Sequence, residues 1–373
     1  MQKEAEPRRI EDVIRKAHIE QRILPEEIKI LLSLKDVTLR ELLFQMARSI
    51  RDKYFGKKIF LYGFIYFSTY CKNSCTFCLF RMPNALAPRY RKNANQILET
   101  AKLLADSGVN LIDLTMGEDP TYATQAEDDS YSVAGIVRQV KAETNLPIMI
   151  SPGVVSRDRL SLLKDAGADW YACYQETHNR KLFSGLRPEQ SYDERLMVKH
   201  EAHSLGLLIE EGILSCVGET VDDLTYSISM MQSLNADQVR IMTFIPQSGT
   251  PMGTLQPNTS DRELLLIALM RLIFPDRLIP ASLDLRGLNG LKERLDAGAN
   301  VVTSVIQPEK GWAGVAHNRL DIENSNRTTQ HVQRILESCG LQPGSQEDYL
   351  DWLEKRKILF EQNKGDEHRC SMS

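Results

Sequence analysis

Beyond Gly56, short apolar runs alternate with longer amphipathic segments, and this alternation limits the possible fold more than any other feature. Three junctions between an amphipathic segment and the next apolar run are alike, at 107–110, 166–169 and 297–300. In each junction a glycine can supply the left-handed residue that ends a helix. The apolar runs, each a candidate strand, are 59–67, 111–115, 148–151, 170–174, 207–214, 238–243, 278–283 and 300–305.

Eight strands that are each followed by a helix predict an α/β fold, a closed (β/α)8 TIM-type barrel over 57–340. A doubly wound open sheet is the alternative, but no Gly-x-Gly-x-x-Gly turn follows the first strand. Residues 1–56 show helical periodicity without strands and predict an N-terminal helical extension. The segment 341–373 is expected to form a short C-terminal helix and tail.

Composition excludes several classes of protein. The 373 residues carry a net charge of −4 from 46 basic and 50 acidic side chains, so no basic excess favours binding to nucleic acid. The longest apolar run, 59–67, is far shorter than the roughly 20 residues that span a bilayer. No apolar segment follows the charged N-terminus as in a signal peptide. We therefore expect a cytoplasmic protein without a membrane partner.

Three of the seven cysteines, Cys71, Cys75 and Cys78, are spaced C-x3-C-x2-C directly after the first predicted strand. In a barrel this loop lies at the C-terminal ends of the strands, where active sites gather. A closed zinc site needs a fourth ligand, and the next candidates are the distant Cys173 and His178. Three thiolates on a 4Fe-4S cluster instead leave one iron open. Buried core thiols are the alternative, which the polar loop disfavours.

This cysteine spacing, with Phe77 before the third cysteine, resembles the signature of the radical S-adenosylmethionine (SAM) superfamily. Residues 116–120 resemble the element that receives the SAM amino group, and 192–196 resemble the biotin synthase segment whose arginine binds the SAM carboxylate. Residues 212–219 resemble the fifth-strand motif, with departures at Leu214 and Cys216. The resemblance implies one 4Fe-4S cluster held by Cys71, Cys75 and Cys78. It also implies SAM contacts from Phe77, Glu118, Ser151, Glu176 and Arg195.

Within that superfamily the chain resembles the methylornithine synthases of pyrrolysine biosynthesis. The similar strings are 64–73, 113–120, 174–177, 239–244 and 280–285. This resemblance implies an isomerase that converts L-lysine into (3R)-3-methyl-D-ornithine, the first step of that pathway. It further implies hydrogen abstraction by a 5′-deoxyadenosyl radical, fragmentation and recombination of the carbon skeleton, and a low-potential electron donor such as flavodoxin or ferredoxin.

Charged side chains fall in or at the ends of the predicted strands. They indicate the kind of substrate independently of the family resemblance. A charge inside a barrel is costly unless it is paired. Residues of both signs therefore indicate a ligand with complementary charges, such as an amino acid with a second ammonium group. Arg240 suits the α-carboxylate, while Asp113 and Asp284 suit the ammonium groups. The expected substrate contacts are Asp113, Glu210, Arg240, Ser282, Asp284, Thr303 and Ser304.

Two structural questions stay open for these charges. Internal pairing of these charges, for example between Arg240 and Asp284, is the alternative to substrate binding. Successive strand residues point to opposite faces, so only one of Glu210 and Glu211 faces the barrel interior, and we favour Glu210.

Three other functions are alternatives to the methylornithine synthase reaction. Biotin synthase binds an auxiliary cluster through cysteines on strands 2, 3 and 5, where this chain has Asp113, Met149 and Glu210. A barrel of the hydrogenase-maturation type is a further alternative. A non-catalytic iron–sulfur protein normally provides four protein ligands, and a fourth is missing here.

Overall fold

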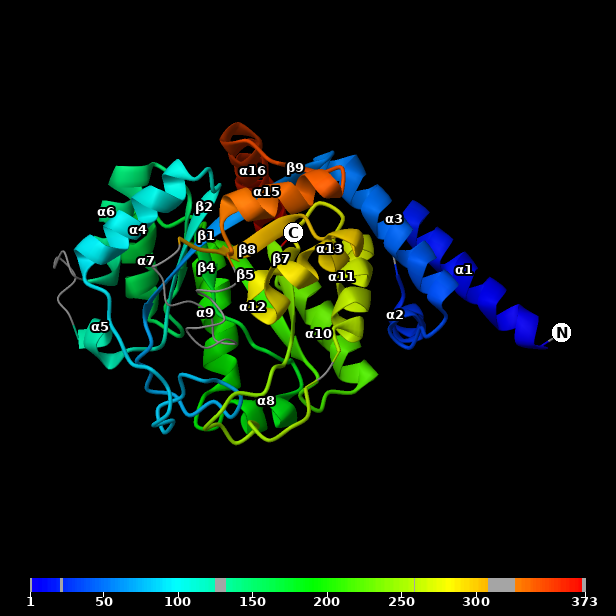
Figure 1. Cartoon of the computed structure of the whole chain (residues 1–373), viewed down its shortest axis with the longest axis horizontal. Coiled ribbons are helices and arrows are strands. Elements are labelled where there is room, and N and C mark those ends of the chain that lie inside the picture. The colour runs from blue at the N-terminus through cyan, green and yellow to red at the C-terminus, as the bar shows by residue number, and fades with distance from the viewer. Residues whose placement is uncertain (1, 21–22, 125–131, 258, 308–325, 371–373) are drawn as a thin grey trace.

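The computed structural model describes residues 2–20, 23–124, 132–257, 259–307 and 326–370 (Figure 1). Among these residues, eight parallel strands follow the order β6-β5-β4-β3-β2-β1-β8-β7. A single parallel bridge between Gln238 of β6 and Leu278, which precedes β7, closes the barrel at its N-terminal end. The strands are β1 (Lys58–Ser68), β2 (Leu111–Met116), β3 (Ile148–Ser151), β4 (Trp170–Ala172), β5 (Leu208–Ser215), β6 (Gln238–Thr243), β7 (Pro280–Ser282) and β8 (Val301–Val305).

The predicted α/β barrel is therefore confirmed, with all eight strands in the expected order. β4 and β7 are shorter than their apolar runs, because the chain leaves the sheet after Ala172 and enters a helix after Ser282. Where the structure describes the chain, no helix combines the length and apolar character needed to cross a bilayer.

Helices cover the outside of the barrel (Figure 1). Most begin at a side-chain N-cap; Ser132, Ser191 and Thr328, for example, each accept a backbone N–H from the first turn. The principal outer helices are α4 (Ala94–Asp106), α6 (Val133–Thr144), α7 (Arg157–Asp165), α9 (Tyr192–Ser204), α10 (Val221–Ser233), α11 (Asp261–Ile273), α13 (Leu291–Asp296) and α15 (Thr329–Ser338). Shorter segments are α5 (Pro120–Thr124), α8 (Arg180–Leu186), α12 (Leu283–Arg286) and the 3-10 turn η1 (Gly287–Gly290).

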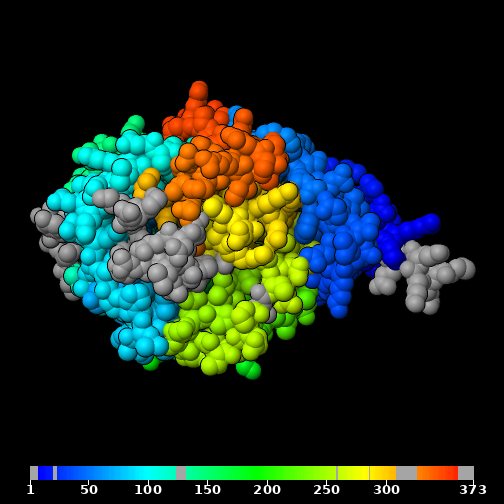
Figure 2. All heavy atoms as spheres, in the orientation of Figure 1, coloured from blue at the N-terminus to red at the C-terminus, as the bar shows by residue number. Residues whose placement is uncertain are grey.

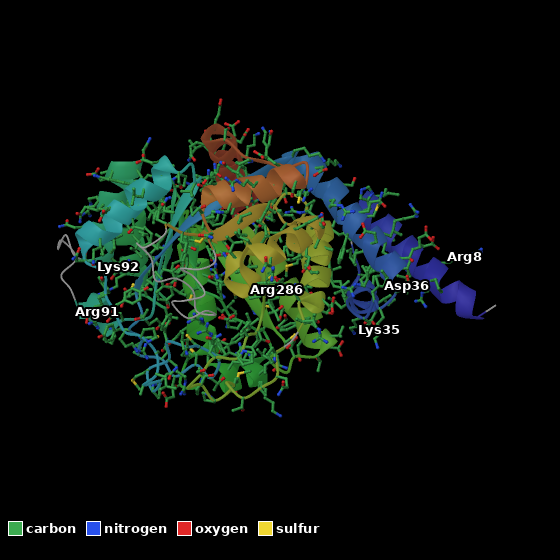
Figure 3. The ribbon with its side chains drawn as sticks, viewed as in Figure 1. Arg8, Lys35, Asp36, Arg91, Lys92 and Arg286 are labelled. Atoms are coloured by element: carbon green, nitrogen blue, oxygen red, sulfur yellow. The ribbon has the colours of Figure 1, made fainter. Side chains whose placement is uncertain are left out.

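The N-terminal helices α1 (Gln2–Glu20), α2 (Pro25–Leu32) and α3 (Val37–Phe55) pack beside the barrel, with α3 against α11. They form the blue projection in Figure 2. Asp36 caps α3 on this side, whereas Arg91, paired with Asp119, lies on the opposite side of the molecule (Figure 3).

The N-terminal end of the barrel is closed by the C-terminal helix α16 (Gln346–Cys370), which follows the short strand β9 (Gln342–Pro343) on β1. An apolar cluster of residues at the starts of the strands, including Phe60 and Trp170, packs against this helix. Tyr349 contributes a hydroxyl contact of 2.9 Å to Tyr62, and Trp352 stacks on Trp170 with ring centroids 5.8 Å apart. The opposite end of the barrel is thereby left as the route to the interior.

Tyr349→Ala should destabilise the protein by about 3–5 kcal/mol, because it removes a buried ring from the base of the barrel. Urea unfolding monitored by circular dichroism measures this difference. The control Leu350→Ala alters a neighbouring side chain that is 43% exposed and should change stability by less than about 0.5 kcal/mol. Equal stability of the parent and Tyr349→Ala would show that α16 does not close the core.

Candidate active site

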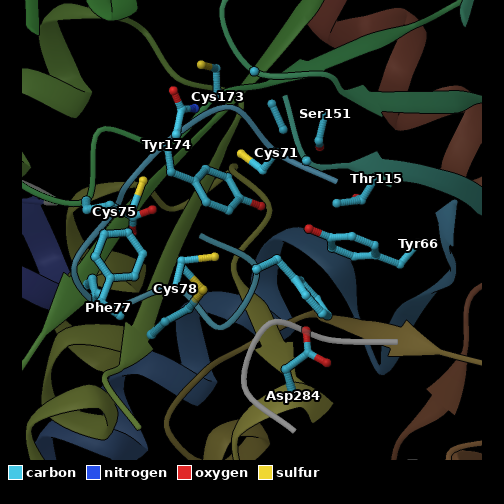
Figure 4. A pocket seen from close by; sticks show the side chains of 18 of the residues that line it. Tyr66, Cys71, Cys75, Phe77, Cys78, Thr115, Ser151, Cys173, Tyr174 and Asp284 are labelled. Carbon is cyan, nitrogen blue, oxygen red and sulfur yellow. The ribbon is translucent and has the colours of Figure 1, made fainter. Parts of the chain in front are cut away.

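A cavity opens at the C-terminal ends of the strands (Figure 4). Loops after β1, β2, β3 and β4 supply one side, and residues of β6 and those following β7 supply the other. Every residue predicted for the site lines this cavity except Glu210, Ser282 and Thr303. The barrel thus brings together side chains that are far apart in the sequence.

The loop that carries the three cysteines is held against the end of β2. The backbone N–H of Lys72 donates to the carbonyl of Glu118 at 3.0 Å. At Gly117, a Cβ atom would lie 2.2 Å from the Tyr70 carbonyl oxygen and 2.9 Å from Cys71 Cβ. Only glycine allows this close approach. Arg81 steadies the same loop by donating to the carbonyl of Cys75 at 3.0 Å.

The three cysteine thiols lie near one another in the cavity (Figure 4). Burial raises the pKa of the Cys78 thiol, and negative charge on Cys75 and Cys71 raises this pKa further. Burial likewise raises the pKa of Cys71, and the Cys75 charge adds to that effect. Three thiolates that share one cavity and raise one another's pKa need a positively charged partner, and the core of an iron–sulfur cluster provides one. The residues therefore fit the 4Fe-4S group.

Buried ion pairs flank the cysteines. Arg195 donates through Nη1 to Glu118 Oε1 at 3.2 Å and through Nε to the Tyr174 carbonyl at 2.7 Å. Arg187 donates through Nη2 to Glu176 Oε1 at 2.6 Å. The second carboxylate oxygen of Glu176 is buried and has no partner among the described residues. That oxygen is available to a polar ligand.

The deeper part of the cavity contains the pair between Arg240 and Glu210. Arg240 donates through Nε to Glu210 Oε1 at 2.6 Å and through Nη1 to Thr303 Oγ1 at 3.0 Å. The Tyr174 hydroxyl donates to Glu210 Oε2 at 2.6 Å. Glu210 and Thr303 therefore lie behind Arg240 and orient its guanidinium, instead of lining the cavity.

Both charges are paired internally, as the alternative to substrate binding expected, but Arg240 pairs with Glu210 and Asp284 pairs with Arg327. Asp284 accepts from Arg327 Nη1 at 2.9 Å and from the Ser304 hydroxyl at 2.8 Å. Ser282 is turned away from the cavity because its hydroxyl caps α12, accepting the backbone N–H of Asp284 at 3.3 Å.

Asp113 is buried between these groups. Burial, followed by the negative charge of Glu210, raises the pKa of Asp113 to about 7, although Arg240 opposes this shift. Thr115 donates its hydroxyl to Asp113 Oδ1 at 2.8 Å. A cation in the cavity would favour the ionised form of this carboxyl group.

Glu210 and Glu211 face opposite sides of β5. Glu210 contacts residues inside the barrel, whereas Glu211 pairs with Lys199 of α9 in the layer between strand and helix. Burial lowers the pKa of the neighbouring His178 to about 4, which keeps this side chain neutral.

Three side chains at the site carried no recognisable signal in the sequence, because Arg187, Gln190 and Arg327 lie in segments without a distinctive motif. Tyr174 ends an apolar run and falls in one of the strings similar to the methylornithine synthases, but nothing in the sequence showed its contact with Glu210.

Comparison with known proteins places this site in a class. Residues 65–228 match the model of the radical SAM superfamily. Together with the cysteine loop at the mouth of the barrel, this match defines a radical SAM enzyme. The group bound in that class is a 4Fe-4S cluster with SAM.

The relatives narrow the assignment. The chain is 43% identical to the 3-methylornithine synthase of Methanosarcina acetivorans over 324 residues, covering 87% of this chain and 91% of the relative. It is similar to the crystal structure of methylornithine synthase (PylB), with a TM-score of 0.85 and 41% identity over 91% of this chain and 99% of that chain. The chain is also 29% identical to the [FeFe] hydrogenase maturase subunit HydE of Thermotoga maritima over 340 residues, which cover 90% of this chain and 94% of that relative. The chain belongs to the 3-methylornithine synthase family.

Replacing Cys71, Cys75 or Cys78 singly with alanine should abolish binding of the cluster, because each thiolate is expected to hold one iron. After anaerobic reconstitution, iron and sulfide analysis should give about four of each in the parent. Cys173→Ala, which changes another cysteine lining the cavity, should retain the cluster. A cluster that persists in Cys71→Ala would contradict the assignment.

Proposed function

We propose that the protein converts L-lysine into (3R)-3-methyl-D-ornithine, the first step of pyrrolysine biosynthesis. The observation that carries this proposal is that one cavity contains both the cysteine triplet and a pocket with Asp113, Arg240 and Asp284. The family to which the chain belongs supports the same reaction. Anaerobic reconstitution followed by analysis of products from isotope-labelled L-lysine, SAM and reductant tests it.

When held by Cys71, Cys75 and Cys78, the cluster together with SAM would supply radical chemistry that can remove hydrogen from an unactivated carbon. The chain's task is to hold the substrate and to keep water and outside reductants away. Aromatic side chains of the cavity wall, among them Phe64, Tyr66, Phe80 and Phe244, suit this role because they are buried and apolar. Such a wall can retain the fragments of a rearranging carbon skeleton.

Arg240 is the proposed partner of the substrate α-carboxylate. Glu210 and Thr303 occupy its Nε and Nη1 atoms, whereas Nη2 has no acceptor in the described part of the chain. Since Arg240 lines the cavity, this remaining donor can meet a carboxylate. The contacts from Glu210 and Thr303 restrict the orientation in which it does so.

Asp113 and Asp284 are the proposed partners of the two ammonium groups. Both carboxylates line the cavity and are held by neighbouring hydroxyls, Asp113 by Thr115 and Asp284 by Ser304. Binding a substrate cation would lower the pKa of Asp113 again and stabilise its charge.

The proposed SAM contacts are Phe77, Glu118, Ser151, Glu176 and Arg195, all of which line the cavity on the cysteine side. Arg195 is assigned to the SAM carboxylate and the loop of Glu118 to the amino group. The unpaired carboxylate oxygen of Glu176 supports a contact with a hydroxyl or amino donor of SAM. A low-potential one-electron donor such as flavodoxin or ferredoxin is proposed as the reductant.

The biotin synthase type of reaction is less well supported. β2, β3 and β5 contain no cysteine, and Asp113 pairs with Met149 where such ligands would be needed. A purely electron-transferring protein would not need the buried charges of the deeper pocket. These features favour the mutase reaction.

Arg195→Ala should weaken SAM binding by about 1.5–3 kcal/mol through loss of a charge-assisted hydrogen bond. Equilibrium binding of SAM to the reconstituted enzyme measures this change. Arg157→Ala, which alters an exposed arginine of α7, serves as the control. Unchanged affinity in Arg195→Ala would show that another group binds the SAM carboxylate.

Asp284→Asn should nearly abolish turnover of lysine while SAM still binds, because the variant keeps the shape of the side chain but removes its charge. Product analysis at saturating SAM measures the effect. The control Asp158→Asn makes the same exchange at an exposed residue of α7 and should leave turnover unchanged. Turnover at the parental rate in Asp284→Asn would reduce Asp284 to a structural partner of Arg327.

A further inference from the structure

Arg187 connects the cysteine loop to the proposed SAM site. It is the C-cap residue of α8 and is buried. One arm of its guanidinium, Nη1, donates to Cys75 Sγ at 3.4 Å, while the other arm, Nη2, donates to Glu176 Oε1 at 2.6 Å. A single cation thus contacts both an expected cluster ligand and a carboxylate of the segment after β4.

The guanidinium of Arg187 is held in one orientation. Glu176 adopts a left-handed backbone conformation with φ of 67°, and its backbone is bonded to β5 through Gly212 and Leu214 at 3.1 and 2.9 Å. The guanidinium also lies 5.3 Å from the centre of the Phe77 ring, which stands beside Cys75 in Figure 4. Because Glu176 is fixed to the strand, the arm directed at sulfur is fixed as well.

Gln190 provides a second, uncharged donor to the same sulfur. Its Nε2 atom donates to Cys75 Sγ at 3.1 Å. The carbonyl oxygen of this amide accepts from Arg187 and Arg195, each at 3.4 Å. Two guanidinium donors require the oxygen on their side, so the nitrogen of Gln190 must face the sulfur.

The other two cysteines have different surroundings. Backbone N–H groups of Asn73 and Glu118 act on Cys71, and that of Phe80 acts on Cys78. In the described part of the chain, Cys75 alone of the three accepts hydrogen bonds from side chains. Its environment can therefore be changed by mutation without altering the backbone of the loop.

We propose that Arg187 and Gln190 are positioning residues that raise the reduction potential of the cluster. Reduction adds one electron, taken from the external one-electron donor, and this electron increases the negative charge near Cys75. N–H donors to the sulfur and a fixed positive charge beside it stabilise the reduced state more than the oxidised state. The inference rests on the proposed function, since it requires the cluster to be bound by Cys75.

The test is a redox titration of the reconstituted holoenzyme without SAM, followed by electron paramagnetic resonance of the reduced cluster. Arg187→Met should lower the ratio of reduced to oxidised cluster at fixed solution potential by about tenfold. This corresponds to a reduction potential that is lower by about 59 mV for one electron. Gln190→Leu removes only a neutral donor and should shift the potential in the same direction by a smaller amount.

Arg180→Met is the matched control, because Arg180 begins the same helix but pairs with the exposed Asp193. Its potential should equal that of the parent. An equal shift in this control would overturn the inference, since general loss of positive charge would then explain the effect. Parental potentials in both Arg187→Met and Gln190→Leu would also overturn it.

The iron and sulfide content of each variant distinguishes failure of the proposed function from failure of the inference about Arg187 and Gln190. A parent protein that holds no 4Fe-4S cluster after reconstitution would contradict the proposed function itself. Where the parent holds the cluster and its potential is insensitive to both changes, the inference alone fails. If Arg187→Met loses the cluster, the potential of Gln190→Leu decides the question.

Discussion

The buried ion pair between Arg240 and Glu210 organises the interior of the barrel. Either charge alone would be strongly destabilising in this position, and their mutual contact is what makes both tolerable. Thr303 and Tyr174 complete the hydrogen bonds, so that groups from β5, β6, β8 and the segment after β4 meet at one point. This network fixes where the floor of the cavity lies and which donor of Arg240 remains for a substrate.

The cavity above this floor has two chemically different ends. The cysteine end contains buried thiols with cationic and amide donors around Cys75, whereas the deep end contains Arg240 with two carboxylates. Ion pairs at both ends orient these groups before any ligand binds. A reaction in which a cofactor-derived radical removes hydrogen from a charged amino acid needs both ends within one cavity, because escape of either partner would end the reaction.

Sequence reasoning succeeded where periodicity or a compact motif carries the information. The alternation of apolar runs predicted all eight strands, and the cysteine spacing predicted the loop that faces the cavity. It did not identify the partner of Arg240, because that partner depends on strand register. Gly212 pairs with Arg240, which places Glu210 on the same face two residues away and within reach of the guanidinium. Contacts through Arg187 and closure by α16 depend on loop paths that no local pattern encodes.

Toward its mouth the barrel is not closed between β6 and β7, and this gap is linked to the position of Asp284 in the cavity. β7 is only three residues long because Ser282 already caps α12, so no further strand residues can pair with β6 toward the mouth. The bridge between Gln238 and Leu278 therefore closes the barrel near its base alone. The early turn into α12 carries Asp284 inward, within reach of Ser304 and Arg327. Continued pairing of β7 would complete the sheet, but it would take from the cavity the carboxylate proposed to bind the substrate.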